Sequence, residues 1–173
     1  MKLSRKAFLC LLLILQACEV CKIADDEKAI QCLNNMPRRD LASHPQVQDY
    51  LKNHKVYVSF STSPKNLSKL LPMLRTLDLE LVEKIYLALP EKYRNTQEYG
   101  PIPPEILNFT KLEIIARDQK DLGPIMKMLP AIEKVAALDP YALVISIDDD
   151  TGFPKGMVNE LIYYSVLYPN AII

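Results

Sequence analysis

Short β-rich runs and helical apolar patterns alternate from residue 55 to the end of the chain. This alternation predicts an α/β sandwich with a mostly parallel, Rossmann-like sheet, because parallel strands need helical crossovers between them. We expect strands at residues 55–62, 82–90, 111–118 and 141–147, with a fifth beginning at 170–173. Since the chain stops where that last strand starts, we also expect the domain to be incomplete at its C-terminus.

Leucine spacing and prolines mark the expected helices. The leucines of residues 67–77 follow the i, i+3, i+4, i+7 pattern of an apolar helix face, and Pro72 should kink or restart that helix. Pro124 and Pro154 suit first helical positions and predict two more helices, which end near residues 138 and 169.

The first 54 residues have a different character. Residues 1–20 combine a basic start, nine apolar residues and a small residue before a cut site, which predicts a signal peptide. The stretch "LQAC" also resembles a bacterial lipobox, which implies a lipoprotein leader with lipid on Cys18. Residues 21–54 are polar, which is typical of a linker, with a short helix expected at 25–36. We therefore expect an exported or membrane-associated protein that meets a membrane only through its leader or that lipid.

The composition of the chain, and the positions of its cysteines and histidines, exclude some classes of function. Lys plus Arg equal Asp plus Glu at 21 each and Trp is absent, so we expect no nucleic-acid partner. All four cysteines lie in the first 32 residues, which excludes thiol chemistry from the main domain. His44 and His54, the two histidines of the chain, lie in or beside the polar linker, and we expect solvated loop residues there.

Three adjacent aspartates, Asp148, Asp149 and Asp150, follow the uncharged run of residues 142–147. Such a run suits a strand buried on both faces, and so a central strand, and ligands of open α/β sheets bind outside the carboxyl ends of strands. On an extended segment Asp148 and Asp150 point to the same side and can share one Mg²⁺ or Mn²⁺, while Asp149 faces the other way. The alternative is an acidic cap for the helix that follows.

Three stretches together resemble a known family. "VYVSFSTSPKNLSKLLPMLRTL", "ARDQKDLGPIMKMLP" and "LVISIDDDTGFP" occur in this order. They resemble the nucleotide-sugar-binding half of GT-A type glycosyltransferases, in a subgroup with a "TTIP-R" opening, a "D-GP-x-x-K-L" middle and a "DDD-x-x-(Y/F)P" metal motif. The resemblance covers residues 55–173 and implies an incomplete GT-A domain there.

The resemblance also implies roles for single residues. Asp148 and Asp150 would hold Mn²⁺ or Mg²⁺, and Lys127 would meet the diphosphate or base of a nucleotide-diphospho-sugar, whose sugar passes to an unknown glycan, lipid or protein acceptor. Metal and lysine would stabilise the negative charge that develops on the leaving nucleoside diphosphate. The implied nucleotide-sugar contacts are Ser61, Thr62, Lys65, Arg117, Asp118, Gly123, Pro124, Lys127, Asp148 and Asp149.

Two departures from the family pattern leave alternatives open. Lys65 stands where the subgroup more often has Arg and lacks the planar fork for a bidentate phosphate contact. No catalytic base can be named in this chain, so a truncated, non-catalytic exported protein that keeps only the donor-binding fold is the alternative. Another Mg²⁺-dependent nucleotidyl or phosphoryl enzyme is disfavoured, because the four glycines form no phosphate-binding loop.

Overall fold

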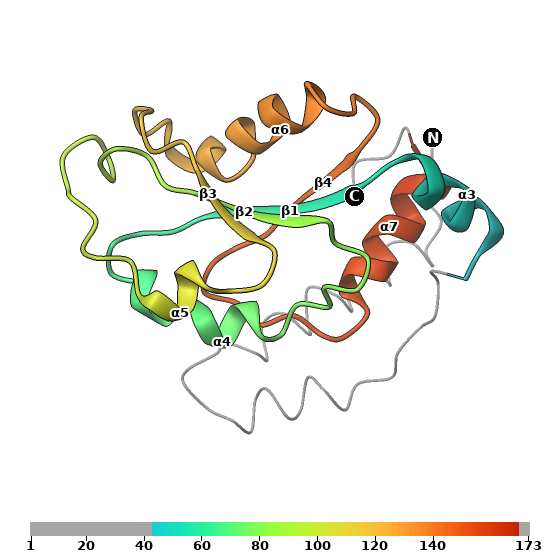
Figure 1. Cartoon of the computed structure of the whole chain (residues 1–173), viewed down its shortest axis with the longest axis horizontal. Coiled ribbons are helices and arrows are strands. Elements are labelled where there is room, and N and C mark those ends of the chain that lie inside the picture. The colour runs from blue at the N-terminus through green and yellow to red at the C-terminus, as the bar shows by residue number, and fades with distance from the viewer. Residues whose placement is uncertain (1–42, 170–173) are drawn as a thin grey trace, which may run out of the picture.

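The computed structural model describes residues 43–169, which form helices on both sides of one sheet (Figure 1). The predictions for the leader, the cysteines, the helix at 25–36 and the strand at 170–173 lie outside these residues. In chain order the elements are α3 (Pro45–Asn53), β1 (Val56–Ser61), the 3₁₀ helix η1 (Leu67–Lys69), α4 (Leu70–Leu74), β2 (Lys84–Ala88), α5 (Pro104–Leu107), β3 (Leu112–Ile115), the 3₁₀ helix η2 (Gly123–Lys127), α6 (Leu129–Ala136), β4 (Leu143–Ser146) and α7 (Met157–Leu167).

The four strands form an all-parallel sheet in the order β3-β2-β1-β4. This is a Rossmann-like α/β fold, which confirms the predicted class and the four strands that lie within the described residues. The prediction of a central place for β4 was wrong for this part of the chain, because β4 pairs only with β1 and Val144 is half-buried. An uncharged run indicates that helices cover both faces of a strand. It does not indicate whether the strand has a hydrogen-bonded partner strand on one side or on both.

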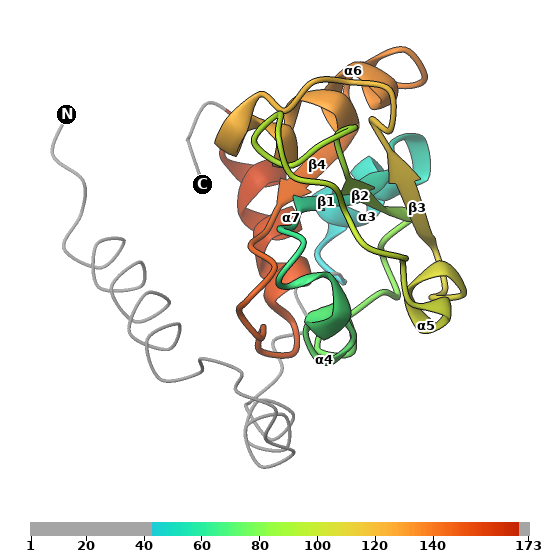
Figure 2. The ribbon, with the colours of Figure 1, turned by 90° about the vertical axis from the view of Figure 1, so that its left-hand side faces the viewer.

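One face of the sheet, called here the α4/α7 face, carries the larger apolar core. Side chains of α3, α4, α5 and α7 pack there against alternate residues of the strands, among them Val58, Phe60, Ile85 and Leu87, all fully buried. Figure 2 shows α4 and α5 on the opposite side of the sheet from α6. The period of two along each strand therefore sends every second residue into this core.

The other face, called here the α6 face, is covered by η2 and α6. Tyr57 and Tyr86 stack there with ring centroids 5.6 Å apart, under Met126, Ala131 and Val135. This second core has fewer buried residues than the first. It also holds polar atoms: the Oγ atoms of Ser59 and Ser146, which face each other in the β1–β4 register, are buried without a partner among residues 43–169.

The predicted helices are present but shorter and more broken than expected. The expected helix over residues 119–138 divides into η2 and α6 at Met128, since Pro130 opens α6 and lacks the N–H that would continue the preceding helix. The last helix starts at Met157 rather than at Pro154, because Gly156 takes the left-handed conformation (φ 84°) that ends the preceding turn. Pro72 lies in the first turn of α4, where the helix restarts after η1.

Helix α3 lies in the segment that the sequence assigned to a linker. It packs against α7, and its Val47 is fully buried. Both histidines flank α3 and neither is a freely solvated loop residue: the half-buried His44 meets the Tyr163 ring edge-on, and His54 pairs with Asp139. This helix was not predicted from the sequence because its residues are mostly polar, and one buried valine does not produce a recognisable apolar helix face. Within residues 43–169 no helix has the length and apolar character needed to cross a membrane.

Candidate functional site

The carboxyl end of β1, the segment after β2, and η2 with the loop before it surround a pocket of about 230 Å³. In parallel sheets all carboxyl ends lie at one edge, which is why loops far apart in the chain meet there. The pocket is lined by Ser61, Thr62, Pro90, Tyr93, Arg94, Tyr99, Asp121, Gly123, Pro124 and Met126. Ser61, Thr62, Gly123 and Pro124 belong to the nucleotide-sugar contacts that the sequence predicted.

Asp149 ties the loop after β4 to the loop after β1. Its carboxylate accepts hydrogen bonds from the Thr62 hydroxyl and from Asn66 Nδ2, at 3.1 Å for the latter. Thr62 is buried, so this contact is shielded from solvent on one side. The bond therefore holds a residue of the pocket wall in place, because Thr62 lines the pocket.

Asp148 points to the opposite face of the sheet from Asp149. Its Oδ1 lies 2.9 Å from Lys127 Nζ on η2, and two-thirds of its side chain (66%) is exposed. Lys127 therefore meets the acidic triplet itself in this structure. The third carboxylate, Asp150, is exposed and accepts a 3.4 Å hydrogen bond from the neighbouring Thr151 hydroxyl.

The donor set tests whether a divalent cation fits. Among residues 43–169 no group of three His, Cys, Asp or Glu side chains is close enough to hold a metal ion by itself. Asp148 and Asp150 nevertheless offer exposed carboxylate oxygens, the hard ligands that Mg²⁺ and Mn²⁺ take. Mg²⁺ is commonly held by one or two carboxylates plus substrate phosphates and waters, so a cation held by these aspartates would need a phosphate ligand to complete its coordination.

A hairpin after β2 forms the far wall of the pocket, and the sequence analysis did not find it. Arg94 and Asn95 both have positive φ (52° and 61°), which turns the chain sharply between Tyr93 and Gln97. The Asp121 carboxylate accepts hydrogen bonds from the backbone N–H of Arg94 and of Gly123, and Asn95 exchanges two hydrogen bonds with the Asp121 backbone. Asp121 thus clamps this hairpin to the segment that opens η2.

Two tyrosines give the pocket its aromatic wall. The rings of Tyr93 and Tyr99 meet edge-on at 6.4 Å, and the Arg94 guanidinium lies 5.2 Å from the centre of the Tyr93 ring. The Tyr99 hydroxyl donates a 2.9 Å hydrogen bond to the Thr62 carbonyl. Burial, and next the charge of Asp121, raise the pKa of Tyr99, so the phenol stays protonated and remains a donor. The only local sequence signal for this wall was a tyrosine pair around a turn-forming asparagine.

Six of the ten predicted nucleotide-sugar contacts lie outside the pocket wall, and three of these, Lys127, Asp148 and Asp149, are described above. Lys65, Arg117 and Asp118 are exposed and do not line the pocket. Arg117 is still near enough for its charge to oppose the upward shift of the Tyr99 pKa. A ligand that fills the pocket and extends from it could reach these side chains, whereas Ser61, Thr62, Gly123 and Pro124 already form its surface.

A second polar cluster lies at the amino ends of the strands, beside an open groove of about 500 Å³ along α3. His54 Nδ1 lies 3.0 Å from Asp139 Oδ2, and Tyr50 donates a 2.6 Å hydrogen bond to the Tyr141 carbonyl. Burial acts to raise the pKa of Asp139, but the Tyr141 N–H and His54 outweigh it and lower that pKa. Burial, and then the charge of Asp139, raise the pKa of Tyr50 to about 12. This cluster joins α3 to the loop before β4 and gathers none of the predicted site residues.

Comparison of the chain with models of protein families, with curated proteins and with solved structures finds no match.

Proposed function

We propose that this chain binds a nucleotide-diphospho-sugar at the pocket, as the donor-binding part of a metal-dependent glycosyltransferase of GT-A type. One observation carries the proposal. The three stretches that resemble this family, although distant in sequence, meet at one edge of the sheet: Thr62 bonds to Asp149, Lys127 pairs with Asp148, and Gly123 and Pro124 line the pocket with Thr62.

The pocket suits the nucleoside end of such a donor. Tyr93 and Tyr99 offer aromatic surface, and Ser61 and Thr62 offer hydroxyl groups beside it. Aromatic faces accept any base by stacking, while a few polar groups fix its orientation. The volume of about 230 Å³ is small for a whole ligand, so the diphosphate and sugar would extend toward the aspartates.

The charged groups at the pocket edge suit the diphosphate. Asp148 and Asp150 would hold Mn²⁺ or Mg²⁺, which when bound supplies positive charge to the leaving nucleoside diphosphate. Lys127 would exchange its contact with Asp148 for a phosphate oxygen, since a flexible ammonium group can follow the stronger negative charge. Lys65, exposed in the loop after β1, would add a second cation.

A second candidate function is donor binding without transfer. The one carboxylate that lines the pocket, Asp121, accepts hydrogen bonds from two backbone N–H groups and serves the hairpin. Within residues 43–169 neither histidine lines the pocket, so these residues place no free general base beside it. An exported protein that retains only the donor-binding fold fits this arrangement.

Calorimetric titration of the full chain with UDP and with GDP, each with and without Mn²⁺, tests the proposal. We expect binding that requires Mn²⁺ and that weakens at least roughly tenfold in Asp150→Ala, because the cation loses a ligand. Asp49→Ala, on the exposed surface of α3, is the matched control and should bind as the unaltered chain does. No binding to either nucleotide under any condition would refute donor recognition. If the chain does bind a nucleotide, incubation with the corresponding nucleotide-sugar separates the two candidate functions, because release of the sugar would favour the transferase over the binding protein.

A further inference from the structure

The outer surface of η2 and α6 carries a row of exposed apolar side chains. Leu122, Ile125, Met128 and Ile132 are 51%, 50%, 40% and 40% exposed. Residues three apart lie above one another on a 3₁₀ helix, and residues four apart are neighbours on an α-helix, so the spacing follows the change from η2 to α6. We call these four residues the apolar stripe. They face away from the core, into which Met126, Ala131 and Val135 of the same segment point.

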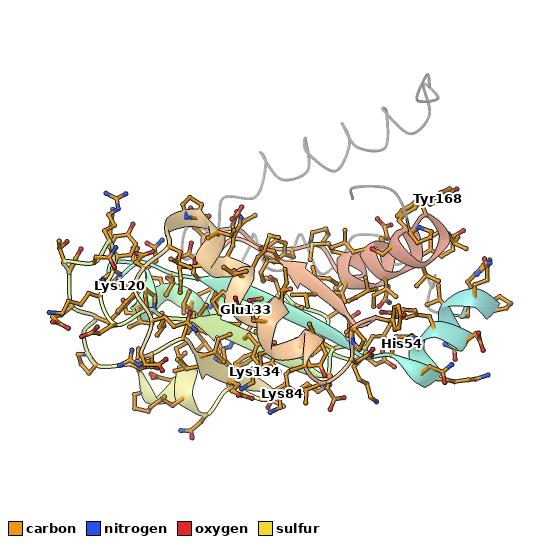
Figure 3. All side chains as sticks on the ribbon, turned by 90° about the horizontal axis from the view of Figure 1, so that it is seen from above. His54, Lys84, Lys120, Glu133, Lys134 and Tyr168 are labelled. Atoms are coloured by element: carbon orange, nitrogen blue, oxygen red, sulfur yellow. The ribbon has the colours of Figure 1, made fainter. Side chains whose placement is uncertain are left out.

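The charged residues along this segment fall into two groups. Three of them have partners within the chain. Asp121 accepts hydrogen bonds from backbone N–H groups, Lys127 forms an ion pair with Asp148, and Lys134 forms an ion pair with Glu113. Lys120 and Glu133 are exposed, and neither makes an ion pair or hydrogen bond with any residue between 43 and 169. Lys120 precedes the apolar stripe and Glu133 follows it, so the stripe has one free positive and one free negative charge at its two ends. Figure 3, seen from the α6 side, shows the two residues well apart along this face.

We propose that the apolar stripe is the contact surface between two copies of this chain, related by a two-fold axis with their η2–α6 segments antiparallel. In a two-fold interface residue i meets residue j and, by symmetry, j meets i. An antiparallel arrangement places Lys120 of each copy beside Glu133 of the other and lays the two stripes against each other. A parallel arrangement would bring like charges together at both ends, which electrostatic repulsion opposes.

The size of the stripe sets the expected strength. Five residues of 3₁₀ helix and eight of α-helix extend about 20 Å, which is short for a contact surface. Interfaces of this size belong to the weak, transient class, so we expect a dimer that forms in the micromolar range or above. A surface that is small but apolar at its centre and charged at its rim fits this class.

Sedimentation velocity of the full chain, from about one to several hundred micromolar, tests the proposal. We expect a concentration-dependent shift from monomer to dimer, and we expect Ile125→Asp with Met128→Asp to remain monomeric. Lys120→Glu alone and Glu133→Lys alone should each weaken dimerisation roughly fivefold or more, since each turns two attractive pairs into two repulsive ones. The double variant, K120E with E133K, should restore it.

Rescue by the double variant identifies the partner as a second copy of this chain. The leader and all other residues are the same in every variant, so they cannot account for a difference in dimerisation. Leu107→Asp, at a residue that is 55% exposed on α5, is the matched control and should dimerise as the unaltered chain does. A monomer at every concentration would overturn the proposal and leave the stripe to another molecule. A dimer that persists in the Ile125 and Met128 variant, or single reversals without effect, would also overturn it.

Discussion

The two faces of the sheet are built from the same strands, yet they differ in what they bury. The α4/α7 face buries aliphatic and aromatic side chains from four helices. The buried Thr76 hydroxyl on this side donates to the Met73 carbonyl and accepts from the Phe153 N–H. The α6 face has a thinner cover, a stack of two tyrosines and two buried serine hydroxyls without partners among residues 43–169.

The difference indicates a division of roles. A well-packed apolar face supplies most of the stability, because each fully buried aliphatic side chain contributes roughly 1.5–3 kcal/mol. Buried polar atoms without partners cost stability. The α6 face holds two of the three such atoms among residues 43–169, and the third is His44 Nδ1 beside α7. Lys127 with Asp148 and the outer apolar stripe both lie on the α6 side. We therefore expect changes on the α4/α7 face to alter folding and changes on the α6 side to alter binding.

The largest effect should come from a matched pair of core truncations. Leu87→Ala, in the middle of the sheet on the α4/α7 face, should lower the free energy of unfolding by about 3–4 kcal/mol. Met126→Ala, equally buried on the α6 face, should lower it by only about 2 kcal/mol, because the thinner cover can collapse into the space. Urea denaturation followed by circular dichroism measures both. Equal losses would contradict the division between the faces.

Two buried hydroxyls provide the second comparison. Thr76→Val should lower the free energy of unfolding by about 1–2 kcal/mol, since it leaves the Phe153 N–H without its 3.0 Å acceptor. Ser59→Ala should leave stability unchanged or raise it by up to about 1 kcal/mol, because it removes a buried hydroxyl that no described residue satisfies. The same denaturation series measures both variants. A clear loss in Ser59→Ala would show that its hydroxyl has a partner after all.

A smaller effect should appear in alkali through the tyrosine stack. Burial is the main cause that raises the pKa of Tyr57 and Tyr86 above the usual 10.0, so the folded chain keeps protons that the unfolded chain loses. This contribution is fully present below pH 10.0 and is lost as the pH rises through the folded values. Tyr86→Phe should therefore show a shallower fall in the urea midpoint between roughly pH 9 and 11. An unchanged fall would assign the alkaline transition to other groups.

The smallest effect on stability should come from the ion pair between Lys127 and Asp148. Asp148→Asn should change the free energy of unfolding by less than about 0.5 kcal/mol, because its partner Lys127 and the carboxylate are both partly in water. Asp149→Asn is the matched comparison on the other face and should cost more, since Thr62 is buried. Thermal unfolding of both variants decides the order. A larger loss at Asp148 would give the pair a structural role.

The fold could be predicted from local patterns, because the apolar period of a strand or a helix is set by residues that are close together in the sequence. The strand beginning at Val56 and the one ending at Ser146 were expected within one or two residues of where they lie. Proline positions predicted where helices restart, but the left-handed Gly156 moved the start of α7 by three residues. Helix α3 was missed, because its stability comes from packing on α7 rather than from its own sequence.

The candidate site could be predicted only in part. The pattern of the chain placed the aspartates at a strand end and sent Asp148 and Asp149 to opposite faces. It did not reveal that Tyr93, Tyr99 and Asp121 close the pocket, because their roles come from a hairpin with positive φ at two ordinary residues. It also did not reveal that Lys127 pairs with Asp148 in this structure.

The sequence by itself determined the alternation of elements, the parallel class of the sheet and the acidic end of β4. The tertiary structure alone decided that β4 is an edge strand among those described, that Tyr99 bonds to Thr62, and that Thr62 bonds to Asp149. The physical reason is distance along the chain: these bonds join residues 37 and 87 positions apart. Periodicity and capping act over a few neighbouring residues, whereas a pocket depends on how the whole sheet brings distant loops to one edge.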